Sequence, residues 1–142
     1  MQNTLDLSSL KKASQSFDHA IAFARKIESK PPCELDFYEM EFARAAVIKH
    51  FELSYELCWK TMKRYIEMDI GAEADILTRK DLFRQAAERG LIDEFAPWVE
   101  FHLARNQTSH VYNETISEKV YKTAFASQPN VQRFVQTMER RV

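Results

Sequence analysis

The chain has 142 residues and a mass of 16.7 kDa, a length typical of one domain that buries about two-thirds of its unfolded surface. Its two glycines and four prolines make up about 4% of the residues, whereas average usage is about 12%. So few turn-forming residues argue against all-β and doubly wound α/β folds, and a hydrophobic content of 45% with 29% charged residues argues against a disordered chain. We therefore expect one all-α domain over residues 1–142.

Positive and negative charges nearly cancel, with 20 Lys and Arg against 21 Asp and Glu and a net charge of -1. This balance argues against a protein that coats nucleic acid nonspecifically, but it is compatible with a small local RNA site. Two cysteines, Cys33 and Cys58, are too few for a disulfide scaffold. Because the sequence contains neither a signal-peptide pattern nor an apolar run of membrane-spanning length, we expect a soluble cytoplasmic protein without membrane contact.

Apolar residues at helical spacing predict a first helix over about residues 5–29 and a second over about residues 37–69. The intervening Pro31-Pro32 ends the first helix, because proline lacks a backbone donor. The second helix has a main apolar stripe and, beside its charged face, a second stripe formed by Phe42, Ala46, Leu53 and Leu57. Two interpretations of this second stripe stay open: burial of the helix on two sides within its own bundle, or an oligomer interface.

The remainder of the chain predicts three or four shorter helices. Residues 70–77 form a connection, after which Thr78 caps a short helix that Gly90 ends.

Pro97 suits the first turn of a further helix that continues to His110. A capping-box pattern at Thr115 predicts the start of the next helix, and the proline-containing segment 128–130 separates it from a last short one. Helices of these lengths predict an up-and-down bundle of five to six members.

Several common catalytic patterns do not occur in the sequence. Two glycines cannot build a phosphate-binding loop, no His-Glu-x-x-His occurs, none of the four histidines follows a Glu by three residues, and no Cys-x-x-Cys occurs. Cys58 lies on the main apolar stripe of its helix, so we expect a buried, inert thiol rather than a nucleophile. We expect no metal or organic cofactor in this chain.

The segment from Arg105 to Asn113 concentrates polar and ionisable side chains at the end of one predicted helix. Arginine supplies a permanent cationic fork that matches a phosphate, and histidine exchanges a proton near neutral pH. Together they can support transesterification of RNA without a metal, because one group moves the proton and the other stabilises the developing charge.

Helical geometry sets a condition on this chemistry. On one straight helix Arg105 and His110 are about 140° apart, so aiming both at one phosphate needs a kink at the helix end or a second copy of the segment across a dimer. The alternative interpretation is structural, with a surface arginine, a satisfied histidine, Asn106 and Asn113 as caps, and Tyr112 as a half-buried aromatic residue.

The string Arg105-Asn106-x3-His110-x-Tyr112-Asn113 resembles the signature of the HEPN superfamily. The chain resembles more specifically the nucleotidyltransferase substrate-binding proteins, also described as HepT toxins. The long-helix pattern from Arg44 to Lys60 and the section from Thr78 to Trp98 are similar to the same family, so that the resemblance covers roughly residues 17–126.

The resemblance implies an all-α homodimer in which the motifs of two protomers line one cleft, with a minimal nucleotidyltransferase as its partner. Arg105 and His110 match the catalytic residues proposed for a metal-independent ribonuclease, and Asn106 matches a polar residue that orders the substrate site. Tyr112 matches the tyrosine to which the partner, using ATP and magnesium, transfers AMP, which would block the cleft and neutralise the toxin.

A second interpretation of the same family assigns no catalysis to the helical protein. In it, the chain is the substrate-binding subunit of a two-component nucleotidyltransferase. The sequence leaves both interpretations open, because a phosphate-binding Arg105 serves either role.

Overall fold

The computed structural model describes residues 5–142, and within that range the chain forms five α-helices, three short 3-10 helices and no strand. The elements in chain order are α1 (Ser8–Glu28), η1 (Pro32–Glu34), α2 (Phe37–Ile70), η2 (Gly71–Ile76), α3 (Arg79–Glu88), α4 (Ala96–Asn106), η3 (Thr108–His110) and α5 (Glu114–Arg141). The predicted all-α fold class is therefore confirmed.

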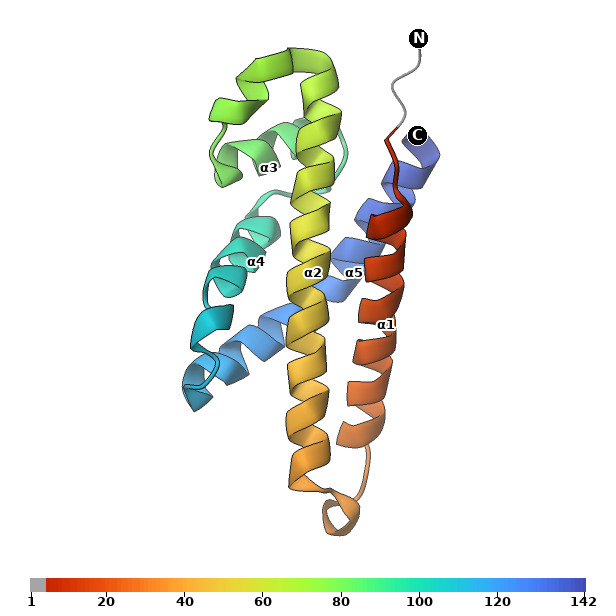
Figure 1. Cartoon of the computed structure of the whole chain (residues 1–142), viewed down its shortest axis with the longest axis vertical. Helices are drawn as coiled ribbons and strands as arrows, with labels where there is room; N and C mark the ends of the chain where they lie inside the picture. The colour runs from red at the N-terminus through yellow and green to blue at the C-terminus, as the bar shows by residue number, and fades with distance from the viewer. Residues whose placement is uncertain (1–4) are drawn as a thin grey trace.

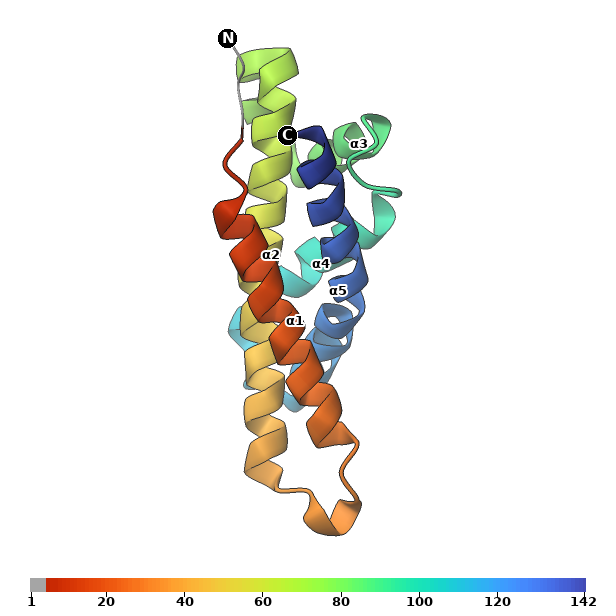
Figure 2. The same cartoon turned by 90° about the vertical axis from the view of Figure 1, so that its right-hand side faces the viewer.

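Helix α2 lies at the centre of the arrangement, in contact with each of the other four α-helices. It runs beside α1 in the opposite direction, and α5 crosses the bundle obliquely (Figure 1). Figure 2 shows the bundle from the side of α1 and α5, with α4 behind α2. The polar segment 105–113 thus begins in the last turn of a helix, α4, that packs against both α2 and α5.

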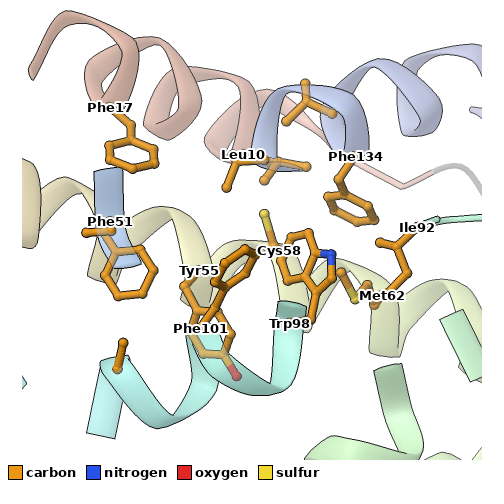
Figure 3. Close-up of a cluster of buried hydrophobic side chains, with 14 of the residues drawn as sticks. Leu10, Phe17, Phe51, Tyr55, Cys58, Met62, Ile92, Trp98, Phe101 and Phe134 are labelled. Carbon is orange, nitrogen blue, oxygen red and sulfur yellow. The ribbon is translucent and has the colours of Figure 1, made fainter. Parts of the chain in front are cut away.

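An aromatic cluster around Trp98 fixes α4 to the rest of the bundle. The Trp98 ring lies 5.9 Å from Phe83 of α3, 5.3 Å from Phe101 of α4 and 6.0 Å from Phe134 of α5, measured between ring centroids. Such inclined aromatic pairs are favourable beyond the area they bury. Figure 3 shows this part of the core, in which side chains of α1, α2, α4 and α5 meet. The helix that carries Arg105 is therefore held rigidly.

The predicted boundaries of α3 are confirmed by its capping contacts. The Thr78 hydroxyl accepts a hydrogen bond from the Asp81 N–H at 3.1 Å. At the other end Gly90 has a φ of +74°, and the Leu91 N–H donates to the Ala86 carbonyl at 2.9 Å. This is a Schellman motif, which needs a left-handed residue and therefore favours glycine.

The predicted break at residues 128–130 is wrong, because α5 continues through Pro129. A proline inside a helix costs about 3 kcal/mol, whereas each large apolar side chain that becomes buried contributes about 1.5–3 kcal/mol. Beyond the proline Val131, Phe134 and Met138 are buried on the same face as Val120. Continuing the helix is therefore favourable despite the lost backbone hydrogen bond.

Two predicted boundaries around the motif also differ from the structure. Helix α4 ends at Asn106 instead of continuing to His110. The Thr108 hydroxyl donates a hydrogen bond to the Arg105 carbonyl at 2.8 Å and so competes with helical hydrogen bonding. Helix α5 is capped by Asn113, whose side-chain oxygen accepts from the Ile116 N–H at 3.1 Å, and not by Thr115.

Two residues of the second apolar stripe of α2 fit the interpretation of burial within the bundle, and two do not. Ala46 and Leu57 are partly buried against the core, as expected for a helix packed within its own bundle. Phe42 and Leu53, however, are 66% and 43% exposed. The bundle of one chain therefore leaves part of the stripe uncovered.

No helix within residues 5–142 is long and apolar enough to cross a membrane.

Candidate functional site

Arg105 is anchored to α2 near the end of α4. Its Nε donates to Oε1 of Glu56 at 2.8 Å, and its Nη2 lies 4.0 Å from Oε1 of Glu52. The other carboxylate oxygen of Glu56 accepts from Nε1 of Trp59 at 3.1 Å. Glu56 is thus fixed on two sides and holds the guanidinium in one orientation.

This anchoring leaves most of the guanidinium free to bind a ligand. Arginine has five N–H donors, of which Glu56 takes one at hydrogen-bond distance. The side chain of Arg105 is 35% exposed, and the charge of an arginine is permanent in proteins. The arrangement therefore presents a positioned cation with donors available for a phosphate.

His110 and Tyr112 lie on the turn between α4 and α5. The His110 N–H donates to the Gln107 carbonyl at 2.9 Å, and the His110 carbonyl accepts from the Asn113 N–H at 3.0 Å. The His110 ring approaches the Tyr112 ring edge-on, with 6.2 Å between centroids. Both side chains are exposed, Tyr112 by 85%. The turn therefore leaves both the imidazole and the phenol open to solvent.

The structure places Arg105 against α2 and Asn106 beside His102 of α4, but it does not join either of them to His110. Over the described part of the chain, no hydrogen bond links Arg105 with His110 or Tyr112. One of the two conditions that helical geometry sets for this chemistry, a break in the helix between Arg105 and His110, is met, because α4 stops at Asn106 and the 3-10 turn follows.

A groove of about 660 Å³ lies beside the motif, between the first half of α2 and the start of α5. Its lining residues are Phe37, Met40, Glu41, Arg44, Ala45, Ile48, Lys49, Glu52, Thr108, Val111, Tyr112, Glu114 and Ser117. We call it the α2–α5 groove. Arg44 lies 3.7 Å from Glu114, and its Nε is buried without a hydrogen-bond partner. The volume of the α2–α5 groove falls within the range of small-molecule sites.

A second polar cluster adjoins Asn106 from the side of α3. The Tyr55 hydroxyl lies 2.8 Å from Nδ1 of His102 and 3.4 Å from Nη1 of Arg79. Nε2 of His102 lies 3.4 Å from Nδ2 of Asn106. The Arg79 guanidinium also stacks on Trp59, 3.5 Å from the ring centroid. No role is predicted from the sequence for Tyr55, Arg79 or His102, although His102 precedes Asn106 by one helical turn.

The environment of this cluster determines which of its groups are charged. Burial raises the pKa of Tyr55 to about 12. Burial, followed by the positive charge of Arg79, lowers the pKa of His102. At neutral pH the phenol therefore keeps its proton and the imidazole is uncharged.

Cys58 is buried, as its position on the apolar stripe predicted. Its burial is complete and raises the pKa of its thiol well above its usual range. Cys33 is free and exposed. Within residues 5–142 no group of three or more His, Cys, Asp or Glu side chains is placed to share a metal ion.

A family model described as "Nucleotidyltransferase substrate binding protein like" matches residues 5–140. The chain belongs to this family. The chain is also similar to a solved structure of HI0074 from Haemophilus influenzae, which is described as a substrate binding domain of a nucleotidyltransferase. The two are 27% identical in sequence, with a TM-score of 0.79. The match covers 94% of this chain and 99% of that one.

In a comparison of sequences, the chain is similar to a protein of Haemophilus influenzae named "Probable ribonuclease HepT". The two sequences are 39% identical over 79 residues, which is 54% of this chain and 54% of the relative. The match thus spans about half the length of that relative. Together these similarities confirm the family resemblance read from the motif.

Proposed function

We propose that this chain is the partner of a minimal nucleotidyltransferase and that its free homodimer is a metal-independent endoribonuclease, the toxin of a toxin–antitoxin pair. The observation that carries the proposal is that Arg105 is anchored with N–H donors still available, and that an exposed His110 lies on the turn that follows. Membership of the family and the similarity to a protein named as a ribonuclease support it.

In the proposed reaction, an RNA 2′-oxygen attacks the adjacent phosphorus and the 5′-oxygen leaves, giving a 2′,3′-cyclic phosphate and a 5′-hydroxyl end. His110 takes the proton of the 2′-hydroxyl or gives one to the leaving oxygen. Arg105 stabilises the extra negative charge of the phosphorane. Asn106 binds the substrate next to Arg105.

Tyr112 is the proposed site of neutralisation by the partner. Its phenol oxygen would attack the α-phosphorus of ATP, forming a phosphodiester bond to AMP and releasing pyrophosphate. The 85% exposure of Tyr112 supports this role, because a modifying enzyme needs access to the hydroxyl. The added nucleotide brings bulk and negative charge to the α2–α5 groove, which Tyr112 lines, and would exclude RNA.

The proposed dimer explains how Arg105 and His110 act on one phosphate. Arg105 and His110 of one protomer do not interact with each other. In a cleft lined by the motifs of two protomers, the second protomer supplies another Arg105 and His110 to the same phosphate. The exposed Phe42 and Leu53 of α2 support a second copy as the cover of this helix face.

The test is growth of cells that express this chain alone, its Arg105→Ala or His110→Ala variant, or the chain together with the neighbouring nucleotidyltransferase. Wild type alone should arrest growth, and either substitution or the partner should relieve the arrest. His19→Ala, an exposed histidine of α1, is the matched control and should arrest growth like wild type. Purified dimer that binds no RNA, with both motif variants as toxic as wild type, would contradict the proposal.

A second candidate function is a non-catalytic substrate-binding subunit of a two-component nucleotidyltransferase. The α2–α5 groove favours it, because its volume of about 660 Å³ suits a bound small molecule. The two candidates differ in the expected effect of His110→Ala. A binding subunit tolerates this substitution and loses function with Arg105→Ala, whereas the ribonuclease loses activity with both.

A further inference from the structure

Arg79, Tyr55, His102 and Asn106 form a continuous series of polar contacts that leads from α3 through α2 to the end of α4. The successive distances are 3.4 Å from Arg79 Nη1 to the Tyr55 hydroxyl, 2.8 Å from that hydroxyl to His102 Nδ1, and 3.4 Å from His102 Nε2 to Asn106 Nδ2. We call these four residues the side-chain relay. Only its last residue, Asn106, has a role in the proposed function.

The direction of the relay follows from the Tyr55 hydroxyl. Arg79 can only donate, so it uses a lone pair of the phenol oxygen. If His102 Nδ1 also donated, the phenol proton would have no acceptor among the described residues, although Tyr55 is only 1% exposed. A buried donor without a partner costs far more than an exposed one. Tyr55 therefore donates to Nδ1 of His102.

This assignment fixes the proton of His102 on its other nitrogen. A neutral imidazole carries one proton, and with Nδ1 accepting, that proton lies on Nε2. The charged groups around the ring are Glu56 of α2, Arg79 of α3 and Arg105 of α4, and burial together with the two arginines outweighs the carboxylate and keeps the ring neutral. His102 thus presents an N–H group toward Asn106.

An N–H group facing Asn106 determines how its amide is turned. The two ends of an amide have nearly the same shape, and the hydrogen-bond partners decide which end faces which neighbour. Because Nε2–H needs an acceptor, Asn106 turns its Oδ1 toward His102, a rotation that an exposed side chain makes easily. The NH2 group is then directed away from His102.

We propose that His102 and Tyr55 are positioning residues, which hold the Asn106 amide so that its NH2 group donates to a phosphodiester oxygen of the strand bound by Arg105. The assignment of the ligand rests on the proposed function, whereas the orientation of the relay does not. Asn106 then supplies a neutral donor beside the cationic donors of Arg105. Its orientation is set by groups that never touch the ligand.

The first test measures the proton on His102 directly in the wild-type dimer, by long-range ¹H–¹⁵N NMR of protein with ¹⁵N-labelled histidines at pH 7.5. The expected result is an unprotonated Nδ1 and a protonated Nε2. Tyr55→Phe removes the donor and should shift the ring toward a mixture of both forms. A protonated Nδ1 in the wild type would overturn the relay, and this readout needs neither RNA binding nor catalysis.

The second test measures binding of a 2′-O-methyl RNA octamer, which cannot be cleaved. Tyr55→Phe and Asn106→Ala should each raise the Kd by about fivefold, as expected for loss of one oriented hydrogen bond. The double variant should bind no worse than Asn106→Ala alone, because Tyr55 acts through Asn106. Tyr65→Phe, a half-buried tyrosine on the same helix, is the control and should bind like wild type.

The outcomes separate the relay from the proposed function. Wild-type affinity of Tyr55→Phe beside a weakened Asn106→Ala, or fully additive losses, would overturn the positioning role. If Arg105→Ala binds the octamer as tightly as wild type, the proposed RNA site is wrong. In that case the nitrogen shifts of His102 still decide the orientation of the relay.

Discussion

The orientation of Arg105 in the candidate site is set by Glu56 and Trp59 of α2. Because arginine keeps its positive charge in any environment, the ion pair with Glu56 does not change the charge of Arg105. Glu56 instead orients the guanidinium, and Trp59 in turn orients Glu56. A partly exposed ion pair of this kind contributes little to the free energy of unfolding. Its contribution is to direction, because it holds the guanidinium of Arg105 in one orientation.

Contrasting burial of the two cysteines gives a prediction for single side chains. Cys58→Ser places a hydroxyl in the completely buried site of Cys58 and should lower the free energy of unfolding by about 1–3 kcal/mol, the cost of a poorly satisfied buried polar group. Cys33→Ser, at the exposed thiol, should change it by less than about 0.5 kcal/mol. Urea unfolding of both variants measures the difference.

Thiol labelling provides an independent check on the same residues. In the native protein a thiol reagent should modify Cys33 and leave Cys58 unmodified until urea is added. Equal stability of the two serine variants, or rapid native labelling of both thiols, would contradict the burial of Cys58.

At the scale of elements, the predictions that succeeded depended on local signals. The long α2 follows from an uninterrupted apolar periodicity, and Thr78 and Gly90 mark the ends of α3 because capping is a property of neighbouring residues. The predicted end of α4 is wrong because a side chain, Thr108, competes for a backbone carbonyl. The predicted break at Pro129 is wrong because burial beyond it, a property of the folded bundle, outweighs its local preference.

The same distinction applies to the candidate site. The motif residues 105–112 stand close together in the sequence and could be singled out from it. Tyr55 and His102 are 47 residues apart, and Glu56 and Arg105 are 49 apart, so only the packing of α4 on α2 brings them together. No spacing in the sequence records such a pair.

The start of α5 offers a prediction that separates the observed cap from the expected one. Asn113→Ala removes the acceptor of the Ile116 N–H and should lower the free energy of unfolding by about 1 kcal/mol. Thr115→Ala, two residues later and exposed, should have an effect below about 0.5 kcal/mol. Thermal and urea unfolding of the two alanine variants give the comparison, and a larger loss for Thr115→Ala would favour the capping box instead.

On the scale of the whole molecule, α2 connects Arg105, the side-chain relay and the α2–α5 groove. It supplies Glu56 and Trp59 to Arg105, Tyr55 to the side-chain relay, and one wall of the α2–α5 groove. The same helix exposes Phe42, whose ring lies 6.4 Å from that of Tyr38. Leu53, the other exposed residue of this stripe, lies one turn before Glu56, so a partner that covers Leu53 would adjoin the residue that anchors Arg105.

Phe42→Lys tests whether the exposed face of α2 is the proposed dimer interface. An apolar aromatic residue at the centre of an interface commonly contributes 2 kcal/mol or more to binding, so the dimer Kd should rise by at least about tenfold. The change adds a charge at a side chain that is 66% exposed in one protomer, so the helical content of the protomer should not change. Sedimentation equilibrium measures the Kd, and circular dichroism measures the helical content.

Met68→Lys is the matched control, because Met68 is 47% exposed near the opposite end of the same helix. It should leave the dimer Kd within about twofold of wild type, as expected for a surface substitution. If the proposed cleft needs two protomers, Phe42→Lys should also lose RNA cleavage at concentrations where it is monomeric, although Arg105 and His110 are intact, and regain it when concentrated. Cleavage by a monomeric Phe42→Lys protein would instead assign the whole site to one chain.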